Sequence, residues 1–328
     1  MSKLVTIFGG SGFVGRYIAR QMAQEGWRVR VAVRRPNEAM FVKPYGVVGQ
    51  VEPVLANIRD DASVASVLNG ADAVVNCVGI LAESGRNSFD AVQAEGAGRV
   101  ARIAAADGIT RMVHISAIGA DPESDSDYAR TKALGEAAVL EHMPEALILR
   151  PSIIFGPEDE FFNRFASMAR FGPLLPVVGA DTRFQPVYVD DVAKAAALGV
   201  MGEAKPGVYE LGGPETASFR DLMVQMLSVI LRRRLVVNIP FWIARIMGGG
   251  FDLLNGLTGG LIQGPITRDQ VRNLARDNVV SASMRGFDDL GITPVAMEAV
   301  LPEYLWRFRP QGQYDAITNS AKNLKSEP

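Results

Sequence analysis

The sequence predicts an α/β protein built on a doubly wound parallel sheet, with a smaller C-terminal lobe. An apolar strand pattern at residues 3–8 runs directly into a glycine-rich turn and then into an amphipathic stretch that ends near Trp27. Strand and helix patterns alternate from there to about residue 150, which is the order that builds a parallel sheet covered by helices. After Pro151 the alternation loosens and proline and glycine become denser, so we expect the second lobe to begin there.

The elements between the first helix and Pro151 follow from runs of apolar residues and their spacing. Residues 73–78 are apolar apart from Asn76, as expected for a strand that is covered on both faces of a parallel sheet. In chain order we predict a strand over 28–33, a strand over 51–56, a helix over 60–68, a strand over 73–78, a loop over 79–87, a helix over 89–106, a strand over 111–116, a helix over 128–141 and a strand over 146–150.

The turn after the first strand has the form Gly-x-x-Gly-x-x-Gly and opens a helix. Glycine lets the backbone turn tightly and approach a pyrophosphate, and the helix N-terminus supplies free N–H groups. Any tight turn can use glycine, but one that links a strand to a helix near the N-terminus favours a Rossmann-type dinucleotide fold. We place the cofactor phosphates against Gly9, Gly10, Ser11, Gly12, Phe13, Val14 and Gly15.

The end of the second strand indicates which dinucleotide binds. A protein that selects NAD usually carries Asp or Glu here, about twenty residues past the glycine turn, to bond the ribose 2′-hydroxyl. This chain has Arg34 and Arg35, and the first acidic residue that follows is Glu38. A guanidinium can hold a 2′-phosphate through two hydrogen bonds, so we predict NADP(H). The alternative is a pair of solvated charges at a strand end.

Composition limits the other function classes. The net charge is −2 and the sequence pI is near 5.9, so we expect no nucleic-acid partner. A single cysteine excludes an internal disulfide framework, and two histidines beside it argue against a His/Cys zinc site, so we predict no metal. The first strand begins at residue 3, which leaves no room for a targeting peptide in this numbering, and the cysteine usage fits a reducing compartment.

A second chemical motif is Tyr128-x-x-x-Lys132, in the helix after the fifth strand. Residues four apart stand on one face of a helix. This arrangement suits carbonyl reduction, because the phenol can donate a proton to an oxygen and a nearby ammonium lowers the tyrosine pKa. The same lysine can bond the nicotinamide ribose. The alternative is a surface helix, because this spacing is common by chance.

These motifs resemble the landmarks of the short-chain dehydrogenase/reductase superfamily, in its extended or atypical branch. Besides the glycine turn and the Tyr-Lys pair, the chain has LRPSIIFGP at 149–157 and QPVYVDDV at 185–192, in the same order as the superfamily. The phenylalanine-rich segment FFNRFASMARFGP at 161–173 is similar to that of the accessory nucleotide-binding subunits of respiratory complex I, the NADH:ubiquinone oxidoreductase. This likeness covers nearly the whole chain, from Val5 to about Arg309.

The resemblance to complex I subunits implies a structural role for the bound nucleotide. In that family NADP(H) is bound tightly and lies far from the electron path, near the junction of the peripheral and membrane arms and close to the quinone region. It implies other complex I subunits as partners. It also implies a location on the cytoplasmic face of a bacterial inner membrane, or on the matrix side if the chain is a mature mitochondrial protein.

The sequence departs from the superfamily pattern near the end of the fifth strand and after the third. An active reductase adds a serine or threonine near the end of the fifth strand, and our alignment places Ala117 in that position, with Ser116 one place early. A shift of one residue along a strand turns a side chain to the opposite face, but a strand that ends at Ile115 still lets Ser116 reach the site. Asn57 stands where relatives commonly carry Asp near the adenine. The family positions for catalysis are Tyr128, Lys132 and Ser116, and further cofactor contacts are Asn57, Val78, Gly79, Ser116, Tyr128, Lys132, Pro151 and Ile153.

The sequence therefore leaves three hypotheses for the function. The leading hypothesis is a non-catalytic, NADP(H)-holding accessory subunit of complex I. The second is an active NADP-dependent reductase or epimerase of the extended branch. The third is a regulatory protein that senses NADP(H).

The C-terminal lobe contains an unusually apolar segment at 239–266, interrupted by Pro240, the glycines at 248–250 and charged residues. Its uninterrupted apolar run is too short to span a membrane. We therefore predict that the segment docks on a membrane surface, lipid headgroups or apolar partner subunits, with Phe241 and Trp242 as anchors. The alternative is a buried lid over the nucleotide pocket. We divide the chain into an NADP-binding domain at 1–150, to which residues of about 177–211 return, a lobe at 151–309 and a polar tail at 310–328.

Overall fold

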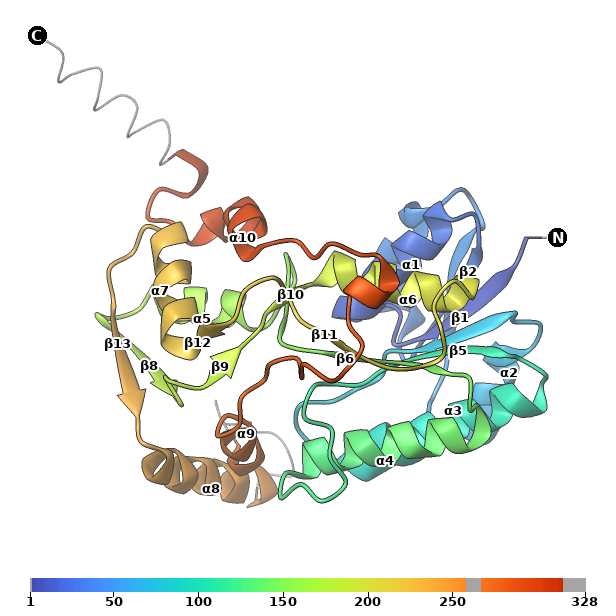
Figure 1. Ribbon diagram of the computed structural model, residues 1–328, viewed down its shortest axis with the longest axis horizontal. Coiled ribbons are helices and arrows are strands. Elements are labelled where there is room, and N and C mark those ends of the chain that lie inside the picture. Colours follow the sequence, from blue (N-terminus) through green and yellow to red (C-terminus); the bar gives the residue numbers. More distant parts are fainter. Residues whose placement is uncertain (1, 258–266, 315–328) are drawn as a thin grey trace, which may run out of the picture.

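A computed structural model describes residues 2–257 and 267–314 of the chain. Its centre is a seven-stranded sheet with the strand order β11-β6-β5-β4-β1-β2-β3, in which every neighbouring pair is parallel (Figure 1). The strands are β1 (Leu4–Phe8), β2 (Arg28–Val33), β3 (Val51–Leu55), β4 (Ala73–Asn76), β5 (Arg111–Ile115), β6 (Leu147–Pro151) and β11 (Gly207–Leu211). The predicted doubly wound α/β fold is therefore confirmed.

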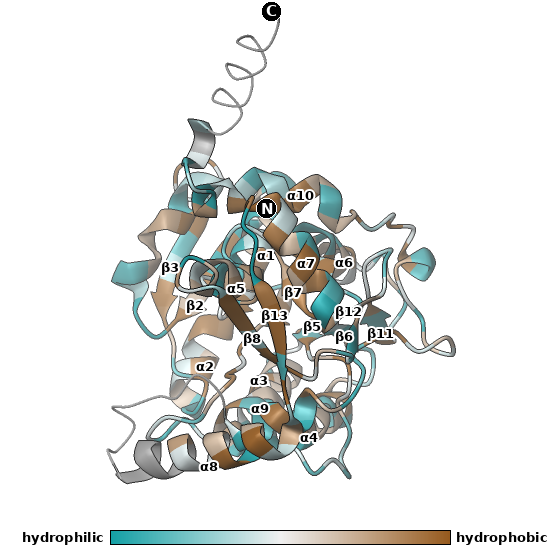
Figure 2. Ribbon diagram, turned by 90° about the vertical axis from the view of Figure 1, so that its left-hand side faces the viewer, coloured by the Kyte–Doolittle hydropathy of each residue, from teal (hydrophilic) through white to brown (hydrophobic). Residues whose placement is uncertain are grey.

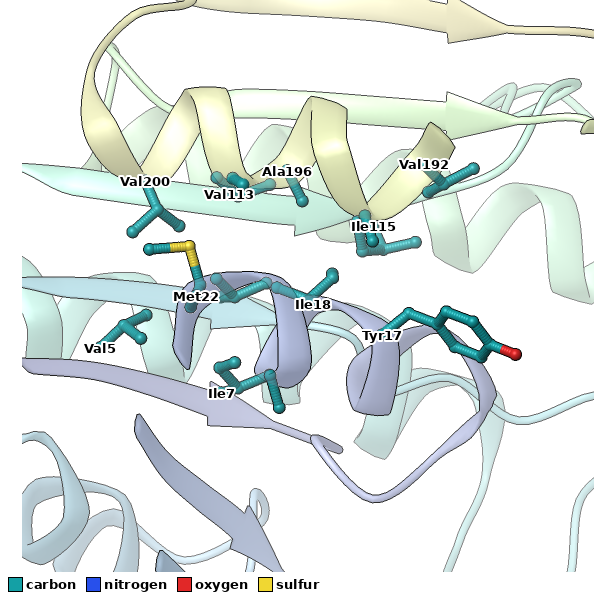
Figure 3. Close-up of a cluster of buried hydrophobic side chains, with 14 of the residues drawn as sticks. Val5, Ile7, Tyr17, Ile18, Met22, Val113, Ile115, Val192, Ala196 and Val200 are labelled. Carbon is teal, nitrogen blue, oxygen red and sulfur yellow. The ribbon is translucent and has the colours of Figure 1, made fainter. Parts of the chain in front are cut away.

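Helices cover both faces of this sheet. The helices α1 (Phe13–Gln24) and α6 (Val189–Met201) cover one face, and α2 (Asp61–Leu68), α3 (Glu95–Ala106) and α4 (Asp127–His142) cover the other. Figure 3 shows Ile18 and Met22 of α1 and Val200 of α6 pointing into one cluster with side chains of β1 and β5. Successive strand residues alternate between the two cores, because Ile7 packs under α1 while Phe8 packs toward α2 and α3.

The strand order reverses between β1 and β4. The chain leaves β1 toward β2 and β3 on one side and later returns to β4, β5 and β6 on the other. The connections that follow β1 and β4 therefore diverge at the carboxyl ends of the strands, and ligands of open α/β sheets bind in the crevice that this creates.

The predicted helix over 89–106 begins differently from the expectation. A π-helical turn, η2 (Asp90–Ala94), precedes α3. This turn brings the Gln93 carbonyl so close to Gly135 of α4 that a Cβ on Gly135 would lie 2.3 Å from the carbonyl oxygen. A 3-10 segment, η1 (Pro36–Tyr45), also follows β2 in a stretch for which the sequence indicated no element.

The C-terminal lobe has its own core, formed by Phe161, Phe165, Phe184 and Phe219 together with aliphatic side chains. It contains α5 (Phe162–Met168), β8 (Leu174–Val178), α7 (Phe219–Val229), β13 (Leu235–Ile239), α8 (Phe241–Leu257), α9 (Arg268–Asn273) and α10 (Met297–Leu305). Two-stranded pairs link β7 (Ile154–Phe155) with β10 (Val187–Tyr188) and β9 (Arg183–Phe184) with β12 (Ala217–Ser218). The 3-10 turns η3 (Asp288–Leu290), η4 (Trp306–Phe308) and η5 (Gly312–Tyr314) complete the described chain.

The strands β8 and β13 form a separate parallel pair at one edge of the molecule. Figure 2 shows this pair facing the viewer and coloured largely as hydrophobic. Its outer residues are exposed: Leu174 by 52% and its register partner Leu235 by 66%.

The helix α8 occupies residues 241–257 of the apolar segment 239–266, and residues 258–266 lie outside the described residues. The helix continues through Gly248, Gly249 and Gly250, although glycine disfavours helices. Packing explains this continuity, because a Cβ on Gly248 would lie 2.9 Å from the backbone nitrogen of Arg268. Tertiary contact with α9 therefore needs glycine at this position. The described part of the chain contains no helix both long and apolar enough to cross a membrane.

The chain returns to the central sheet after α9. Residues 278–287 run beside β11, where Glu210 N donates to the carbonyl of Arg285 at 2.9 Å and Ser281 N donates to the Glu210 carboxylate at 2.8 Å. The edge strand of the seven-stranded sheet is thus covered by the C-terminal third of the sequence.

Candidate nucleotide-binding site

The glycine turn has the geometry that a phosphate cradle requires. Gly9 adopts a φ of +74°, which favours glycine, and Gly12 N donates to the Gly9 carbonyl at 2.9 Å. A Cβ on Gly15 would lie 2.3 Å from that same carbonyl oxygen, so α1 can approach the turn only because residue 15 is glycine. Gly12 caps α1 without a side-chain hydrogen bond, which leaves first-turn N–H groups for an anion.

A pocket of about 410 Å³ opens beside this turn, lined by Ser11, Val33, Arg34, Arg35 and Glu38. Arg35 pairs with Glu38 at 3.1 Å, and both side chains are exposed. Arg34 makes no ion pair with any residue that the structure describes. Its positive charge is therefore available to a ligand, whereas the charge of Arg35 is already partly neutralised.

Three further predicted residues follow β4 and β3. Val78 follows β4 and contacts the glycine turn, since a Cβ on Gly9 would lie 3.3 Å from its side chain. Gly79 lies beside Lys132, whose Nζ would be 3.3 Å from a Cβ at residue 79. Asn57 follows β3, and its Oδ1 accepts a hydrogen bond from Arg59 N at 3.2 Å, so part of its bonding capacity shapes the turn.

Lys132 is buried, with its Nζ donating to the carbonyl of Ile115 at 3.1 Å. Burial lowers the pKa of its ammonium to about 8, while the Glu136 charge acts in the opposite direction. The lysine thus lies at the carboxyl ends of β4 and β5, on the ligand side of the sheet.

Tyr128 lies one turn earlier on α4, edge-on to the ring of Phe89 at 6.1 Å between centroids. Burial, reinforced by the charge of Asp269, raises the pKa of its phenol to about 12. The expected lowering of this pKa by Lys132 is not seen in this structure, where burial and the Asp269 charge set the direction of the shift. The phenol stays protonated at neutral pH and can act as a hydrogen-bond donor.

Ser116 is buried, and its hydroxyl donates to the carboxylate of Glu136. Glu136 in turn accepts from Arg150 Nε at 2.9 Å and from Nη2 at 2.6 Å. The hydroxyl proton of Ser116 is therefore directed into a buried ionic network, and only its lone pairs remain for another group. Glu136 and Arg150 were not identified from the sequence, because no local pattern marks two charges that are 14 residues apart as partners.

The last two predicted contacts follow β6. Pro151 ends the strand, is buried, and accepts a hydrogen bond from Ile118 N at 3.1 Å. Ile153 is partly buried and packs against the core of the C-terminal lobe.

The sequence reasoning also missed Asp269 of α9. Its carboxylate meets the N-terminus of α4, where it accepts from Asp127 N at 2.8 Å and from Tyr128 N at 3.2 Å. The only local signal was the capping box of α9 itself, formed by Thr267 and Gln270. Within residues 2–257 and 267–314, no group of three or more His, Cys, Asp or Glu side chains is arranged to hold a metal ion.

Residues 5–212 match the model of the NAD dependent epimerase/dehydratase family. The chain is 34% identical to the mitochondrial NADH dehydrogenase [ubiquinone] 1 alpha subcomplex subunit 9 of Arabidopsis thaliana, over 97% of this chain and 81% of the relative. It is 30% identical to the mitochondrial NADH-ubiquinone oxidoreductase 40 kDa subunit of Neurospora crassa, over 98% and 84%. The Bordetella bronchiseptica enzyme WbmH, solved with NAD+, superposes with a TM-score of 0.66 at 16% identity, over 95% of this chain and all of that one, which shows the shared fold.

Proposed function

The chain belongs to the NAD dependent epimerase/dehydratase family and to the family of the complex I alpha subcomplex subunit 9, and from that premise we propose that it is a non-catalytic accessory subunit of a respiratory NADH:ubiquinone oxidoreductase. The observation that carries this proposal is the similarity to complex I subunits along 97% of the chain, including the C-terminal lobe. The fold alone would fit an enzyme equally well.

We propose NADP(H) as the bound nucleotide. The glycine cradle fits a pyrophosphate, and Arg34 brings an unpaired guanidinium to the pocket beside it, where a 2′-phosphate would lie. Asn57, Val78, Gly79, Pro151 and Ile153 would line the rest of the site. When bound, such a nucleotide can supply a hydride.

The residues that would surround the nicotinamide are better suited to binding the nucleotide than to catalysing a reaction with it. Tyr128 and Lys132 can both donate to the nicotinamide ribose. Ser116 directs its proton to Glu136, and Ala117 has no hydroxyl, so a substrate oxygen would lack one donor of an active reductase. One such donor can be worth about 10²–10³ in rate.

The partners in this proposal are other complex I subunits near the quinone region, and a membrane surface or lipid headgroups that meet the segment 239–266. In the described part of that segment, Trp242 is 65% exposed and Ile246 67% exposed. Phe241 differs from the expectation, because it packs partly against the buried cluster of Val178 and Ala244. Trp242 and Ile246 are therefore the anchors we propose, on the cytoplasmic face of a bacterial inner membrane or the matrix face of a mitochondrial one.

Native purification after gentle detergent extraction tests the proposal. We expect the chain to co-migrate with complex I subunits at fixed stoichiometry and to release NADP(H) on denaturation. A monomer that carries no nucleotide and associates with no respiratory subunit would overturn it.

An active NADP-dependent reductase or epimerase is the second candidate, favoured by the intact Tyr128 and Lys132 on one face of α4. Turnover of NADPH with a carbonyl or nucleotide-sugar substrate, lost in Tyr128→Phe, would select it. Partner binding that changes with the ratio of NADP+ to NADPH would select the sensing protein instead.

A further inference from the structure

The helix that carries Tyr128 and Lys132 does not cap its own N-terminus alone. Asp269, from α9 in the C-terminal lobe, accepts three hydrogen bonds there: from Asp127 N at 2.8 Å, from Tyr128 N at 3.2 Å and from Ser126 Oγ at 3.0 Å. Ser126 Oγ in turn accepts from Ala129 N at 3.3 Å. A carboxylate at this end of a helix satisfies free N–H groups and interacts favourably with the helix dipole.

Other residues of the same region hold the segment that leads into α4. Arg272 Nη1 donates to the carbonyl of Asp125 at 2.9 Å, and Arg276 pairs with the Asp125 carboxylate at 3.1 Å. Gln270 Nε2 reaches the carbonyl of Leu81, in the loop after β4, at 3.4 Å. Figure 1 shows α9 beside the first turn of α4. The helix α9 and the residues just after it are thus bonded to the loop before α4 and to the loop after β4.

The helix α8 packs against α9 and fixes its position. Val271 of α9 and Ala244 of α8 are buried against each other in one cluster. A Cβ on Gly248 would lie 2.9 Å from Arg268 N and 3.0 Å from the carbonyl carbon of Thr267. The opposite side of α8 exposes Trp242 and Ile246. One helix therefore joins the exposed apolar surface to the capping residue of α4.

We propose that Asp269 is a positioning residue for Tyr128 and Lys132, and that the contact of α8 with α9 sets how firmly the nucleotide is held. The nucleotide in this statement rests on the proposed function, but the placement of Tyr128 by Asp269 does not. The charge of Asp269 also raises the pKa of the Tyr128 phenol, which keeps that group a donor.

Two variants of Asp269 separate its charge from its hydrogen bonds. Asp269→Asn keeps an acceptor at the helix N-terminus, and Asp269→Ala removes it. With NADPH-loaded protein, we expect Asp269→Ala to release NADPH about fivefold to thirtyfold faster, the range that corresponds to loss of a good cap. Asp269→Asn should have a smaller effect on release. Both variants should lower the pKa of Tyr128, followed by NMR of ring-labelled tyrosine.

Asp277→Asn is the matched control, because Asp277 also accepts from a backbone N–H of its own lobe, that of Arg183 at 2.8 Å, and does not contact α4. If Asp269 only stabilised its own lobe, the Asp269 and Asp277 variants would lose thermal stability alike and would release NADPH at the same rate.

A second pair of variants tests the contact between α8 and α9 without touching Asp269. Gly248→Ala forces a Cβ against the backbone of α9, whereas Gly250→Ala on the same helix meets no atom within 4 Å. Both changes raise helix propensity equally. We expect faster NADPH release from Gly248→Ala only.

Equal release from the two glycine variants, together with an unchanged Tyr128 titration in Asp269→Ala, would overturn the inference. If unmodified protein fails to bind NADPH, the proposed cofactor fails, and the Tyr128 titrations of Asp269→Asn and Asp269→Ala then decide whether Asp269 positions the helix: both variants remove the charge, so a difference between them reports the lost hydrogen bonds.

Discussion

Two of the parallel sheets in the described structure, the seven-stranded sheet and the pair β8/β13, are covered very differently. Both faces of the seven-stranded sheet lie under helices, and side chains such as Ile7 and Val31 are completely buried. The two-stranded sheet of β8 and β13 has one buried face and one face that exposes Leu174 and Leu235. Parallel sheets are normally covered on both sides. The nucleotide half is therefore complete as it stands, while the C-terminal lobe presents a surface that another molecule can complete.

The largest effect should come from charging the exposed surface of α8. Full burial of a large apolar side chain contributes about 1.5–3 kcal/mol, so Trp242→Glu combined with Ile246→Glu should remove most of the association with membranes and respiratory subunits. The variant should remain folded and loaded with nucleotide. The measurement is flotation with membranes and co-purification.

Val48→Glu is the control for this pair, because Val48 is fully exposed on the nucleotide half. If Val48→Glu releases the protein as well as the α8 pair does, the two halves do not differ and the comparison fails.

The next effect is on folding stability. Ile7→Ala removes a side chain that is completely buried in the core of Figure 3, which should lower the free energy of unfolding by about 2–5 kcal/mol. Leu235→Ala should change it by less than about 0.5 kcal/mol in the isolated protein, because the side chain is already exposed. Chemical denaturation measures both. Equal losses would mean that the outer face of β13 is covered within the monomer.

A third prediction concerns two arginines, one in each half. Arg34→Ala should lower the affinity for NADPH about tenfold to a hundredfold and leave NADH binding nearly unchanged, because a charged hydrogen bond contributes roughly 1.5–3 kcal/mol. Arg233→Ala, an exposed arginine of the C-terminal lobe, should leave both affinities unchanged. Titration calorimetry measures these affinities. Equal affinity of the unmodified protein for both nucleotides would contradict the assignment of NADP(H).

The smallest effect is expected for Tyr128→Phe. If the phenol only donates one hydrogen bond to the nucleotide, its loss costs about 0.5–1.5 kcal/mol of binding and leaves the assembled complex intact. Assembly and respiratory activity of membranes from cells that carry the variant are the readouts. A large loss of an NADPH-consuming activity would support an enzyme instead.

Sequence reasoning succeeded where the information is local. The first six strands of the sheet are short runs rich in apolar residues, and the glycine turn is defined by residues 9–15 alone, so these were predicted within a residue or two, whereas β11 was not predicted as a strand. It failed where partners are distant in the chain. Asp269 lies 141 residues from Tyr128, and the continuity of α8 through Gly248 depends on its contact with α9.

The orientation of Ser116 shows the same limit. Two neighbouring residues, Ser116 and Ala117, could each be aligned with the catalytic position, and periodicity alone does not choose between them. The bond from Ser116 to Glu136 settles where its proton points. That bond depends on the packing of α4 against the end of β5, which no local pattern encodes.

The return of residues 278–287 to β11 has a consequence for biosynthesis. During synthesis, all seven strands of the sheet emerge from the ribosome before residues 278–287, which cover the edge strand β11. During that interval β11 presents an open strand edge, a known route to pairing with other chains. The nucleotide half cannot finish folding until nearly the whole polypeptide has emerged, so truncations in the C-terminal third should harm solubility even when every nucleotide-contacting residue is retained.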